Sequence, residues 1–576
     1  MVKYSGDKMA SISNSKTLFF FTSPRTPHKM LNEIELLVNN FSGKNWDKEN
    51  QKKFASLLAK EVFFEGKIKE NDDFGARDRI NRAPKALGFV DLNPIKITRI
   101  GKRLLSGKRD YEAFTRQFMK FQLPSPYHID KTGRYSVKPY LELMRLIYDL
   151  DGITKHELAM FGLQLININL YNDIVSQIKK FREEKDKKKY TKKREFIHSY
   201  YQKIVEKIYA EEIRQGDFKL RESDGGDLAS FLYTKKRNLI DYADAAIRYL
   251  KATELVSFNV RSLKIAITEE KKQDVKFLLD NIKREPIIFT SDSDFKEYLF
   301  DDINIQLLTD DKIKLSDKIK LISRSLIKES VIKEEPKIKT ADIEELKDKY
   351  EELHALKIEF IIQKEENNLK TYEEFDDIIR VYNEISEGDV ADPSLIFEWN
   401  TWRVMAMLDD GRVVGNFKID TDGSPLFTAP ANVPDINCDY KDFQMIVEVT
   451  LSTGMKQYEM EGEPVPRHLG KIRKEKNKEA YCLFVAANVS EATLAHFFAL
   501  HKINISYYGG KSKIIPVDVS VLIKILKHAK DKGGIKSGDL QRYLEFLSTK
   551  ATELENEEQW FDIIKRTSEN WTEIRV

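Results

Sequence analysis

The alternation of hydrophobic and polar residues predicts a chain whose middle is almost entirely helical and whose end alternates helices with strands. Residues 291–390 are nearly free of glycine and place apolar residues at three- and four-residue spacing, which is typical of amphipathic helices. After residue 391 we expect a helix around 395–407, strands at 444–449, 481–486 and 513–516, and helices at 458–475, 490–501 and 518–529. This order predicts a mixed sheet flanked by helices.

The front half contains a helix followed by a β-hairpin and a second helix. The first helical segment ends at Gly88, two strands flank a turn at Asn93-Pro94, and a helix follows over 99–105. The arrangement resembles a winged-helix domain. We therefore expect a DNA-recognition fold near the start of the chain.

A similar arrangement recurs further along. Thr154 is placed to cap a helix, with Glu157 at the capping-box position. A helix over 241–252 then runs into a strand, and a second strand returns at 263–268. Two winged-helix-like subdomains in tandem are the economical interpretation.

Charge is unevenly distributed along the 576 residues, a length that predicts three or four domains. Residues 1–290 hold 56 Lys and Arg against 39 Asp and Glu, whereas the remainder holds 40 against 54. A basic front half suits a polyanion such as nucleic acid, because neutralised phosphates release counterions. The alternative is a solvated lysine-rich surface.

Several basic residues of the two subdomains are candidate DNA contacts. Because proline is unfavourable inside a helix, Pro84 leads us to expect a helix that begins near Ala83. The helices around 77–87 and 242–252 are candidate groove readers. The candidate DNA-binding residues are Arg25, in a stiff turn over 23–27, and Arg77, Arg79, Arg82, Lys85, Lys96, Arg248 and Lys251.

Cysteine content and hydropathy indicate a soluble cytoplasmic protein without a membrane partner. Cys438 and Cys482 are the only cysteines, too few for a disulfide framework, and neither has zinc-ligand spacing, so we expect both in the core. The early apolar run over 18–21 is too short for a signal sequence or a membrane span.

Two carboxylates define a candidate catalytic site in the last section. Asp435 follows Pro434, and Glu448 ends the apolar run over 443–447. Two carboxylates at one edge of a sheet suit Mg2+, which binds through few carboxylates and keeps other oxygens around it. The spacing resembles the Pro-Asp … Glu-x-Lys pattern of metal-dependent nucleases, with Thr450 in place of the lysine.

Strand alternation places Glu448 and Thr450 on one face, whereas Val449 points away and offers its carbonyl oxygen to a metal. Further candidates lie on neighbouring helices. Glu461 is placed to bind or orient a water ligand of the metal, His468 to contact the scissile phosphate or move a proton, and Glu398 to serve as a further metal ligand.

Singly, each of these residues has an ordinary structural explanation, such as a turn, an edge-strand charge, a solvated helix position or a capping histidine. Together, a buried-looking strand that ends in Glu, with further acids and a His on adjacent elements, favours a metal site.

These motifs, taken together, resemble type IIS restriction and nicking endonucleases of the AlwI, PleI and MlyI kind, including the large nicking subunits of heterodimeric enzymes. The matching segments are Ser-Pro-Arg-Thr-Pro at 23–27, Arg-Asp-Arg at 77–79, Gly-Phe-Val at 88–90, Ile-Thr-x-x-Gly-Lys at 97–102, Ala-Met-Phe at 159–161, Phe-Glu-Trp-x-Thr-Trp at 397–402, Pro-Asp at 434–435, Glu-Val-Thr at 448–450 and Met-Glu-x-Glu-Pro-Val-x-Arg-His at 460–468.

The resemblance implies a multidomain α+β protein with a C-terminal PD-(D/E)xK nuclease domain and Mg2+-dependent hydrolysis a few base pairs from a short asymmetric site in double-stranded DNA. Asp435, Glu448, Glu398, Glu461 and His468 would form the active site, and Glu-Val-Thr without lysine would be a family trait. It also implies a cognate DNA methyltransferase in the same system.

From these patterns we expect a disordered tail over 1–16, winged-helix-like subdomains over 17–150 and 151–290, a helical linker over 291–390 and the cleavage domain over 391–576. One active site would cut both strands through a homodimer of cleavage domains, a separate small catalytic subunit or sequential turnover. The alternative function is a non-catalytic sequence-specific DNA-binding protein with a degenerate nuclease domain.

Overall fold

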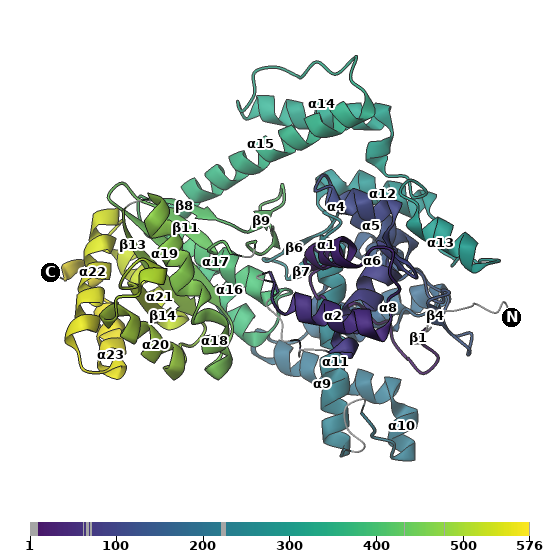
Figure 1. The fold of residues 1–576 in the computed structure, drawn as a ribbon, viewed down its shortest axis with the longest axis horizontal. Helices are drawn as coiled ribbons and strands as arrows, with labels where there is room; N and C mark the ends of the chain where they lie inside the picture. Colours follow the sequence, from purple (N-terminus) through teal and green to yellow (C-terminus); the bar gives the residue numbers. More distant parts are fainter. Residues whose placement is uncertain are drawn as a thin grey trace. The chain divides into compact units, whose positions relative to one another are not determined.

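The computed structural model describes residues 10–61, 63–64, 68, 72–220, 226–430, 432–476 and 478–574. The chain forms two compact units (Figure 1): the first holds Met1–Leu321 and Pro336–Tyr350, and the second holds Ile322–Glu335 and Glu351–Val576. About 58% of the chain is helical and the remainder includes several small sheets, which confirms the mixed α+β class. None of the helices in the described ranges is long and apolar enough to cross a membrane.

The first unit is mainly helical, with three small sheets. Its helices are α1 (Lys29–Phe41), α2 (Lys48–Leu58), α3 (Asp73–Ile80), α4 (Arg99–Leu105), α5 (Asp110–Lys120), α6 (Pro139–Asp149), α7 (Lys155–Met160), α8 (Tyr171–Asp186), α9 (Tyr190–Ile208), α10 (Ala210–Gln215), α11 (Leu228–Lys251), α12 (Lys272–Asn281) and α13 (Asp292–Phe300). Its strands are β1 (Ala10–Ser11), β2 (Val90–Leu92), β3 (Ile95–Ile97), β4 (His128–Ile129), β5 (Ile153–Thr154), β6 (Ser257–Asn259) and β7 (Lys264–Ala266).

Both expected helix–hairpin arrangements are present. Strands β2 and β3 pair antiparallel and lead into α4. Strands β5, β7 and β6 form a three-stranded antiparallel sheet that contacts α6 and α7, and α11 packs on α7. Thr154 and Glu157 form the expected capping box at the start of α7. Gly88 adopts a left-handed backbone conformation, with φ of 77°, where the chain leaves the helical segment.

The prediction that the first of these helices begins near Ala83 is wrong. Helix α3 already spans Asp73–Ile80, and a π-helical turn over Asn81–Lys85 continues it through Pro84. Proline has no N–H to donate and crowds the preceding turn. The helix therefore widens into a π-helical turn at this point, and no new helix begins. Arg77 and Arg79 therefore lie on α3 itself.

The expected disordered tail is described only in part. Residues 1–9 lie outside the described residues, but Ala10–Ser11 form β1 and pair in parallel with His128–Ile129 of β4. Ile12 is buried, and its N–H donates to the Ile129 carbonyl at 3.0 Å. The expectation of disorder therefore does not hold for this part of the segment.

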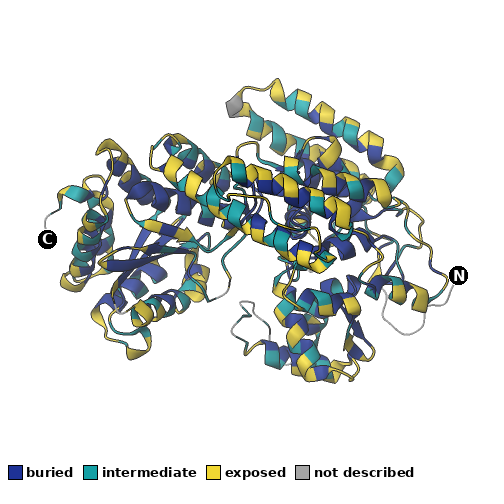
Figure 2. Cartoon of the chain, turned by 90° about the horizontal axis from the view of Figure 1, so that it is seen from above, coloured by how far each residue is buried: buried dark blue, intermediate teal, exposed yellow. Residues whose placement is uncertain are grey.

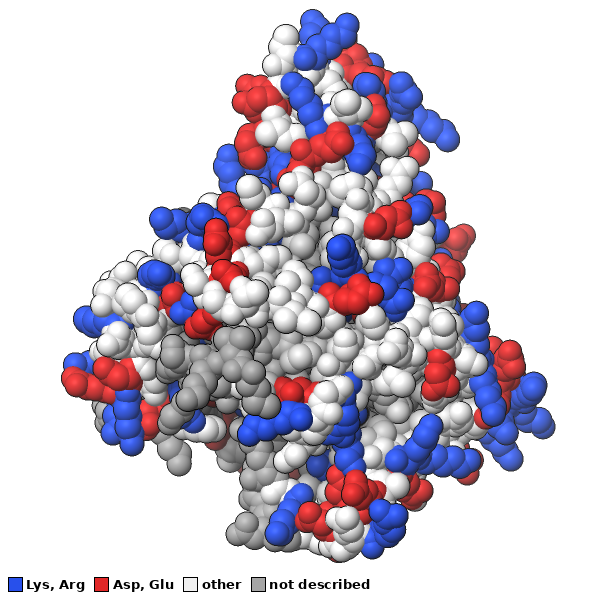
Figure 3. Space-filling model, turned by 90° about the vertical axis from the view of Figure 1, so that its right-hand side faces the viewer, with Lys and Arg blue, Asp and Glu red and all other residues white. Residues whose placement is uncertain are grey.

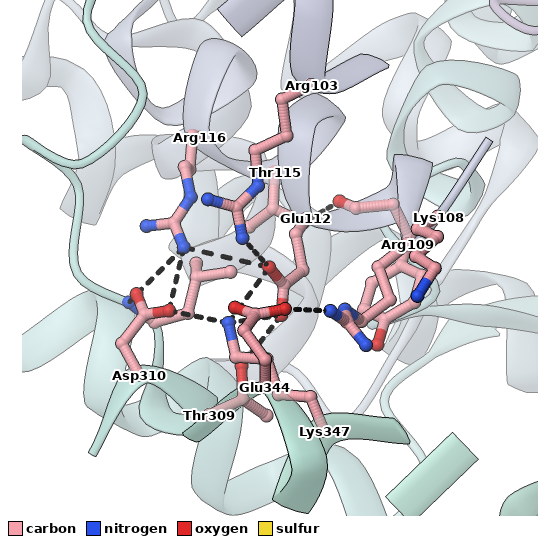
Figure 4. Close-up of polar contacts among 12 residues, drawn as sticks. Arg103, Lys108, Arg109, Glu112, Thr115, Arg116, Thr309, Asp310, Glu344 and Lys347 are labelled. Carbon is pink, nitrogen blue, oxygen red and sulfur yellow. Dashed lines mark hydrogen bonds and ion pairs between the residues drawn. The ribbon is translucent and has the colours of Figure 1, made fainter. Parts of the chain in front are cut away.

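Helices α14 (Lys312–Lys328) and α15 (Ile343–Leu369) each contribute residues to both units, and the expected helical character of 291–390 is confirmed. A buried charge cluster fixes the start of α15 within the first unit (Figure 4). Lys347 lies 2.9 Å from Glu112 and 2.8 Å from Asp310, and Arg116 also contacts Asp310 at 2.8 Å. Arg103 approaches Glu112 at 2.7 Å.

The centre of this cluster is almost without solvent, since Glu112 and Arg116 expose 0% and 1% of their side chains. Replacing Glu112 with Gln leaves the surrounding cations undercompensated in a dry site. We expect Glu112→Gln to lower the free energy of unfolding by about 3–5 kcal/mol, measured by urea denaturation. The control is Glu49→Gln, an exposed partner of Lys53 on α2, for which a loss below about 1 kcal/mol is expected. Equal losses would contradict the prediction.

The second unit is built on one five-stranded sheet (Figure 1). Its further helices are α16 (Phe375–Glu387), α17 (Pro393–Leu408), α18 (Gly454–Glu461), α19 (Pro464–Lys476), α20 (Glu491–Lys502), α21 (Val519–Asp531), α22 (Ser537–Glu553) and α23 (Glu557–Thr567). Its strands are β8 (Arg412–Gly415), β9 (Lys418–Ile419), β10 (Pro425–Phe427), β11 (Ile436–Asp439), β12 (Phe443–Thr450), β13 (Glu479–Ala486) and β14 (Ile514–Asp518).

The strand order of this sheet is β14-β13-β12-β11-β8, so the predicted mixed sheet is confirmed. The three predicted strands become β12, β13 and β14, which run parallel, whereas β11 pairs antiparallel with β12 and with β8. The predicted helix over 458–475 is wrong as one element, because the chain breaks at Gly462 between α18 and α19.

Alternation along β12 and β13 decides what each face of the sheet contacts. Ile446, Cys482 and Phe484 pack with Val465 of α19 and Phe497 of α20 in one hydrophobic cluster. The strands are accordingly among the buried parts of the unit (Figure 2). Glu448 and Thr450 share the Ile446 face, because side chains two residues apart on a strand point the same way. That face is the one covered by α19.

Candidate active site

Antiparallel pairing of β11 with β12 explains why Asp435 and Glu448 belong to one site. Ile436 lies opposite Val447 in the register, so Asp435, the residue before β11, lies opposite Glu448. Opposed residues of two antiparallel strands are near neighbours on one face. Two acidic residues that are 13 positions apart in sequence are therefore brought together by a hairpin with a three-residue connection.

The backbone on both sides of Asp435 is fixed. Its Oδ2 accepts the Val449 N–H at 2.7 Å, and its carbonyl oxygen accepts the Asn416 N–H at 2.9 Å. The Asn416 side chain also donates to the Pro434 carbonyl at 2.7 Å. Asp435 is consequently held at the end of the sheet before any ligand arrives. Val449 contacts Asp435 through its N–H, and its carbonyl oxygen stays a predicted metal ligand.

Glu448 and His468 form a buried pair between β12 and α19. The His468 Nδ1 lies 2.8 Å from Glu448 Oε1. Burial, and then the nearby charge of Glu461, raise the pKa of Glu448 well above its usual value, while burial lowers the pKa of His468 to about 4. The His468 Nε2 is buried without a hydrogen-bond partner among the described residues. Both side chains therefore favour their neutral forms in the metal-free protein.

Glu398 joins this acidic group from α17. Its side chain is buried and its Oε2 accepts the Ala429 N–H at 3.3 Å. Burial, followed by the charge of Asp435, raises the pKa of Glu398 well above its usual value, and Glu448 acts in the same direction. Three carboxylates thus repel one another at one end of the sheet, which makes the site costly to ionise without a cation.

Glu461 and Thr450 flank the three carboxylates. Glu461 ends α18, is half-buried and acts on Glu448 through its charge. Thr450 is buried at the end of β12, and its Oγ1 accepts the Ser452 N–H at 3.1 Å. The structure therefore groups all the predicted catalytic residues in the second unit, but Thr450 brings no charge.

Sequence reasoning did not anticipate Arg467 and Asn432. Arg467 precedes His468 on α19, and its Nη1 donates to Asn432 Oδ1 at 3.1 Å, three residues before Asp435. The sequence shows that Arg467 follows several acidic residues, but it does not show that Arg467 contacts Asn432, which is 35 residues away in the chain.

A second acidic group lies elsewhere in the unit. Glu384, Glu387 and Asp389, at the end of α16, offer oxygen atoms within 4.8 Å of one another. They are partly exposed, and no further feature of the described residues marks them as a ligand site.

The predicted DNA contacts lie in the first unit. Arg25 and Arg248 share Asp244: Arg248 contacts it at 3.0 Å and Arg25 at 4.0 Å, while Arg25 also pairs with Asp241 at 3.3 Å. The turn over 23–27 and helix α11 are thereby joined. Across the face in Figure 3, basic side chains lie next to acidic ones. Neighbouring carboxylates therefore hold the side chains of Arg25 and Arg248 in place.

The remaining candidates differ in exposure. Arg77 stacks on Phe74 at 5.2 Å and Lys96 exposes 57% of its side chain, whereas Arg82 pairs with Asp78 at 2.5 Å. Arg79 pairs with Glu33 through its Nε at 3.1 Å.

Lys85 and Lys251 are buried. A DNA phosphate cannot reach a buried ammonium group without rearrangement, so the proposed interface leaves these two residues out.

Comparison with known proteins gives one family match. The sequence model of the AlwI restriction endonuclease family matches residues 85–525. Because this covers more than half of the chain, the chain belongs to the AlwI restriction endonuclease family. It is therefore a restriction enzyme, a nuclease that binds DNA.

Solved structures include two similar chains. The small subunit R.BspD6I2 of the heterodimeric restriction endonuclease R.BspD6I is 29% identical over 33% of this chain and 98% of its own, with a TM-score of 0.30. The binding domain of the BpuJ1 endonuclease, solved with pyrene- and phenanthrene-modified DNA, is 12% identical over 49% of this chain and 95% of its own, with a TM-score of 0.33. No curated protein matches the chain.

Proposed function

We propose that the chain is a type IIS site-specific endonuclease that hydrolyses a phosphodiester a few base pairs from an asymmetric DNA site, using Mg2+. The observation that carries this proposal is the convergence of Glu398, Asp435 and Glu448 at one end of a sheet, with raised pKa values for the two glutamates. The proposal assigns a PD-(D/E)xK nuclease fold to residues 391–576. Two winged-helix-like subdomains over 17–150 and 151–290 and a helical linker over 291–390 would precede it.

The donor set fits Mg2+. All three side chains offer hard oxygen atoms, and their mutual repulsion is relieved by a divalent cation. Glu398, Asp435 and Glu448 would hold the ion, which when bound would supply positive charge to the phosphate and to the leaving oxygen. The Cys482 thiol lies close enough for Glu448 and Asp435 to act on it, but burial raises the pKa of this thiol well above its usual value. A protonated thiol is a poor metal ligand, so the carboxylate oxygens remain the donors available to a cation.

The protein residues of this site hold and orient the reacting groups. Val449 and Asn416 fix Asp435 through backbone contacts. When Glu448 is ionised its oxygen only accepts, so His468 then carries the proton on Nδ1 and fixes the orientation of the carboxylate. Glu461 is placed at the rim of the site, where a carboxylate can accept a proton from water.

Recognition is proposed to lie in the basic first unit. Phosphate contacts would position the DNA, and base-edge contacts from α3 and α11 would specify the sequence. The partners proposed are double-stranded DNA, a second cleavage domain or a small catalytic subunit, and a cognate DNA methyltransferase.

Plasmid cleavage by the purified chain tests the function. With Mg2+ we expect nicked or linear DNA whose ends map to a fixed distance from one short sequence, and no cleavage in EDTA. Nicked circles that never become linear would show that the chain cuts one strand and needs a second catalytic subunit to cut the other. Specific binding without cleavage under any divalent cation would instead support the non-catalytic alternative.

Arg77 provides a test of the recognition surface. We expect Arg77→Ala to weaken DNA binding and, if the contact is to a phosphate, to reduce the slope of log K against log[salt] by about one. Fluorescence anisotropy over a salt series measures both. The control is Lys53→Ala, which removes an exposed charge on α2 that pairs with Glu49. Unchanged affinity of Arg77→Ala would remove this residue from the interface.

A further inference from the structure

The proposed active site lacks a positively charged side chain at the position where the nuclease pattern has lysine. Thr450 occupies that position, and its hydroxyl already accepts the Ser452 N–H. His468 is buried, and its Nδ1 is committed to Glu448. In phosphodiester hydrolysis the phosphoryl oxygens and the leaving oxygen carry negative charge in the transition state, so a fixed cation near the carboxylates would stabilise it.

Arg467 is positioned by two contacts. Its Nε lies 3.1 and 3.2 Å from the two carboxylate oxygens of Glu463, and its Nη1 donates to Asn432 at 3.1 Å. Its Nη2 has no hydrogen-bond partner among the described residues, and 29% of the side chain is exposed. Two nitrogens are thus held in place, while one edge of the guanidinium keeps its donors.

The contact with Asn432 ties α19 to the loop that carries Asp435. Asn432 adopts a left-handed backbone conformation, with φ of 64°, three residues before Asp435. The same helix presents His468 to Glu448. Arg467 is therefore tied to the loop that leads to Asp435, and it lies close enough to Glu448 for its charge to oppose the rise in the pKa of Glu448 that burial causes.

We propose that Arg467 binds the scissile phosphate through its unpaired Nη2 edge and supplies the positive charge that Thr450 does not. The inference rests on the proposed nuclease function of the same site. A guanidinium presents several donors in a fixed plane and binds phosphate oxygens more specifically than an ammonium does. Glu463 and Asn432 would pre-orient it, so that little conformational entropy is lost when DNA binds.

Single-turnover cleavage by the full chain, with enzyme in excess over DNA, tests this role. Arg467→Ala is expected to lower the cleavage rate by about 10²–10³-fold, with affinity for cognate DNA in Ca2+ unchanged within about threefold. Arg467→Lys keeps the charge but loses the planar donor edge, so an intermediate rate is expected. Added guanidinium should raise the rate of Arg467→Ala by about tenfold or more, a rescue that a purely structural role would not give.

Two controls separate the phosphate contact from other effects. Lys471→Ala removes an exposed cation one turn further along α19 and should leave the rate within about twofold. Asn432→Ala removes the tie to the Asp435 loop but keeps the guanidinium, so its loss should be smaller than that of Arg467→Ala.

Three outcomes would overturn the inference. The first is cleavage by Arg467→Ala within about threefold of the wild-type rate. The second is an equal loss of rate in Arg467→Ala and Asn432→Ala without rescue by guanidinium, and the third is a wild-type rate in Arg467→Lys when guanidinium does not rescue Arg467→Ala. Cleavage that survives in Asp435→Ala would instead overturn the proposed function. Loss in Asp435→Ala with full activity in Arg467→Ala would overturn this inference alone.

Discussion

Asp435→Ala is expected to abolish cleavage of duplex DNA and to leave specific binding intact. Asp435 is the carboxylate that the β11–β12 pairing places opposite Glu448, and its side chain accepts the Val449 N–H. Alanine removes a proposed Mg2+ ligand but no packed hydrophobic group, and the Pro434 and Asp435 backbone contacts to Asn416 remain available. We expect the single-turnover rate to fall by about 10³-fold or more.

The matched control for this substitution is Asp442→Ala. Asp442 is an exposed acid in the turn of the same hairpin, at the end away from Glu448. It should cleave at the wild-type rate, and both variants should bind cognate DNA equally in a gel-shift assay with Ca2+. Full cleavage by Asp435→Ala in Mg2+ would show that the reaction occurs without this carboxylate, and the site assignment would be wrong.

Local sequence patterns predicted much of the second unit because its strands are strongly apolar. Strands β12, β13 and β14 and helices α17, α20 and α21 lie close to their predicted ranges. The prediction that Cys438 and Cys482 are core residues is confirmed, since both are buried and free. The capping box of Thr154 and Glu157 is confirmed because it depends only on residues three apart.

Features that depend on distant contacts were not predictable in the same way. The short strand β11 carries little hydrophobic signal, yet its pairing with β12 decides that Asp435 faces Glu448. The role of Arg467 depends on Asn432, on a different element. The helix start near Ala83 was predicted from Pro84 alone. A π-helical turn accommodates this proline, and local sequence rules do not predict such a turn.

The electrostatic cost of the acidic site could not be read from the sequence. Glu398 and Glu448 each have an ordinary explanation, as a solvated helix position and an edge-strand charge, and only their burial changes their chemistry. The same carboxylates that weaken the metal-free fold would then provide the affinity for a divalent cation. Stability measurements therefore test the metal site independently of cleavage.

Glu448→Gln is expected to stabilise the metal-free protein at neutral pH and to remove its stabilisation by Mg2+. Burial, and then Glu461, raise the pKa of Glu448 in the folded state above the value of about 4.5 that applies to the unfolded chain. Below the unfolded pKa both states hold the proton and there is no penalty. As pH rises above it, the unfolded chain releases the proton first, so stability falls until the folded pKa is reached.

In EDTA at pH 7.5 the glutamine variant should gain about 1–3 kcal/mol in the free energy of unfolding, or about 2–4 °C in Tm per kcal/mol for a unit of this size. Its stability should also depend less on pH between 5 and 8. Mg2+ should raise the Tm of the wild type and leave that of Glu448→Gln unchanged, because a neutral amide is a poor ligand for this cation. Differential scanning calorimetry measures all three effects.

Glu545→Gln is the matched control with the opposite sign. Glu545 lies on α22, and although burial acts to raise its pKa, hydrogen bonds from Lys513 and Tyr481 leave it lowered. Ionised Glu545 therefore favours the folded state above its unfolded pKa, so its replacement should reduce stability at pH 7.5 and leave the response to Mg2+ intact. If Glu448→Gln were instead less stable than the wild type in EDTA, or still responded to Mg2+, Glu448 would not be a metal ligand held at an electrostatic cost.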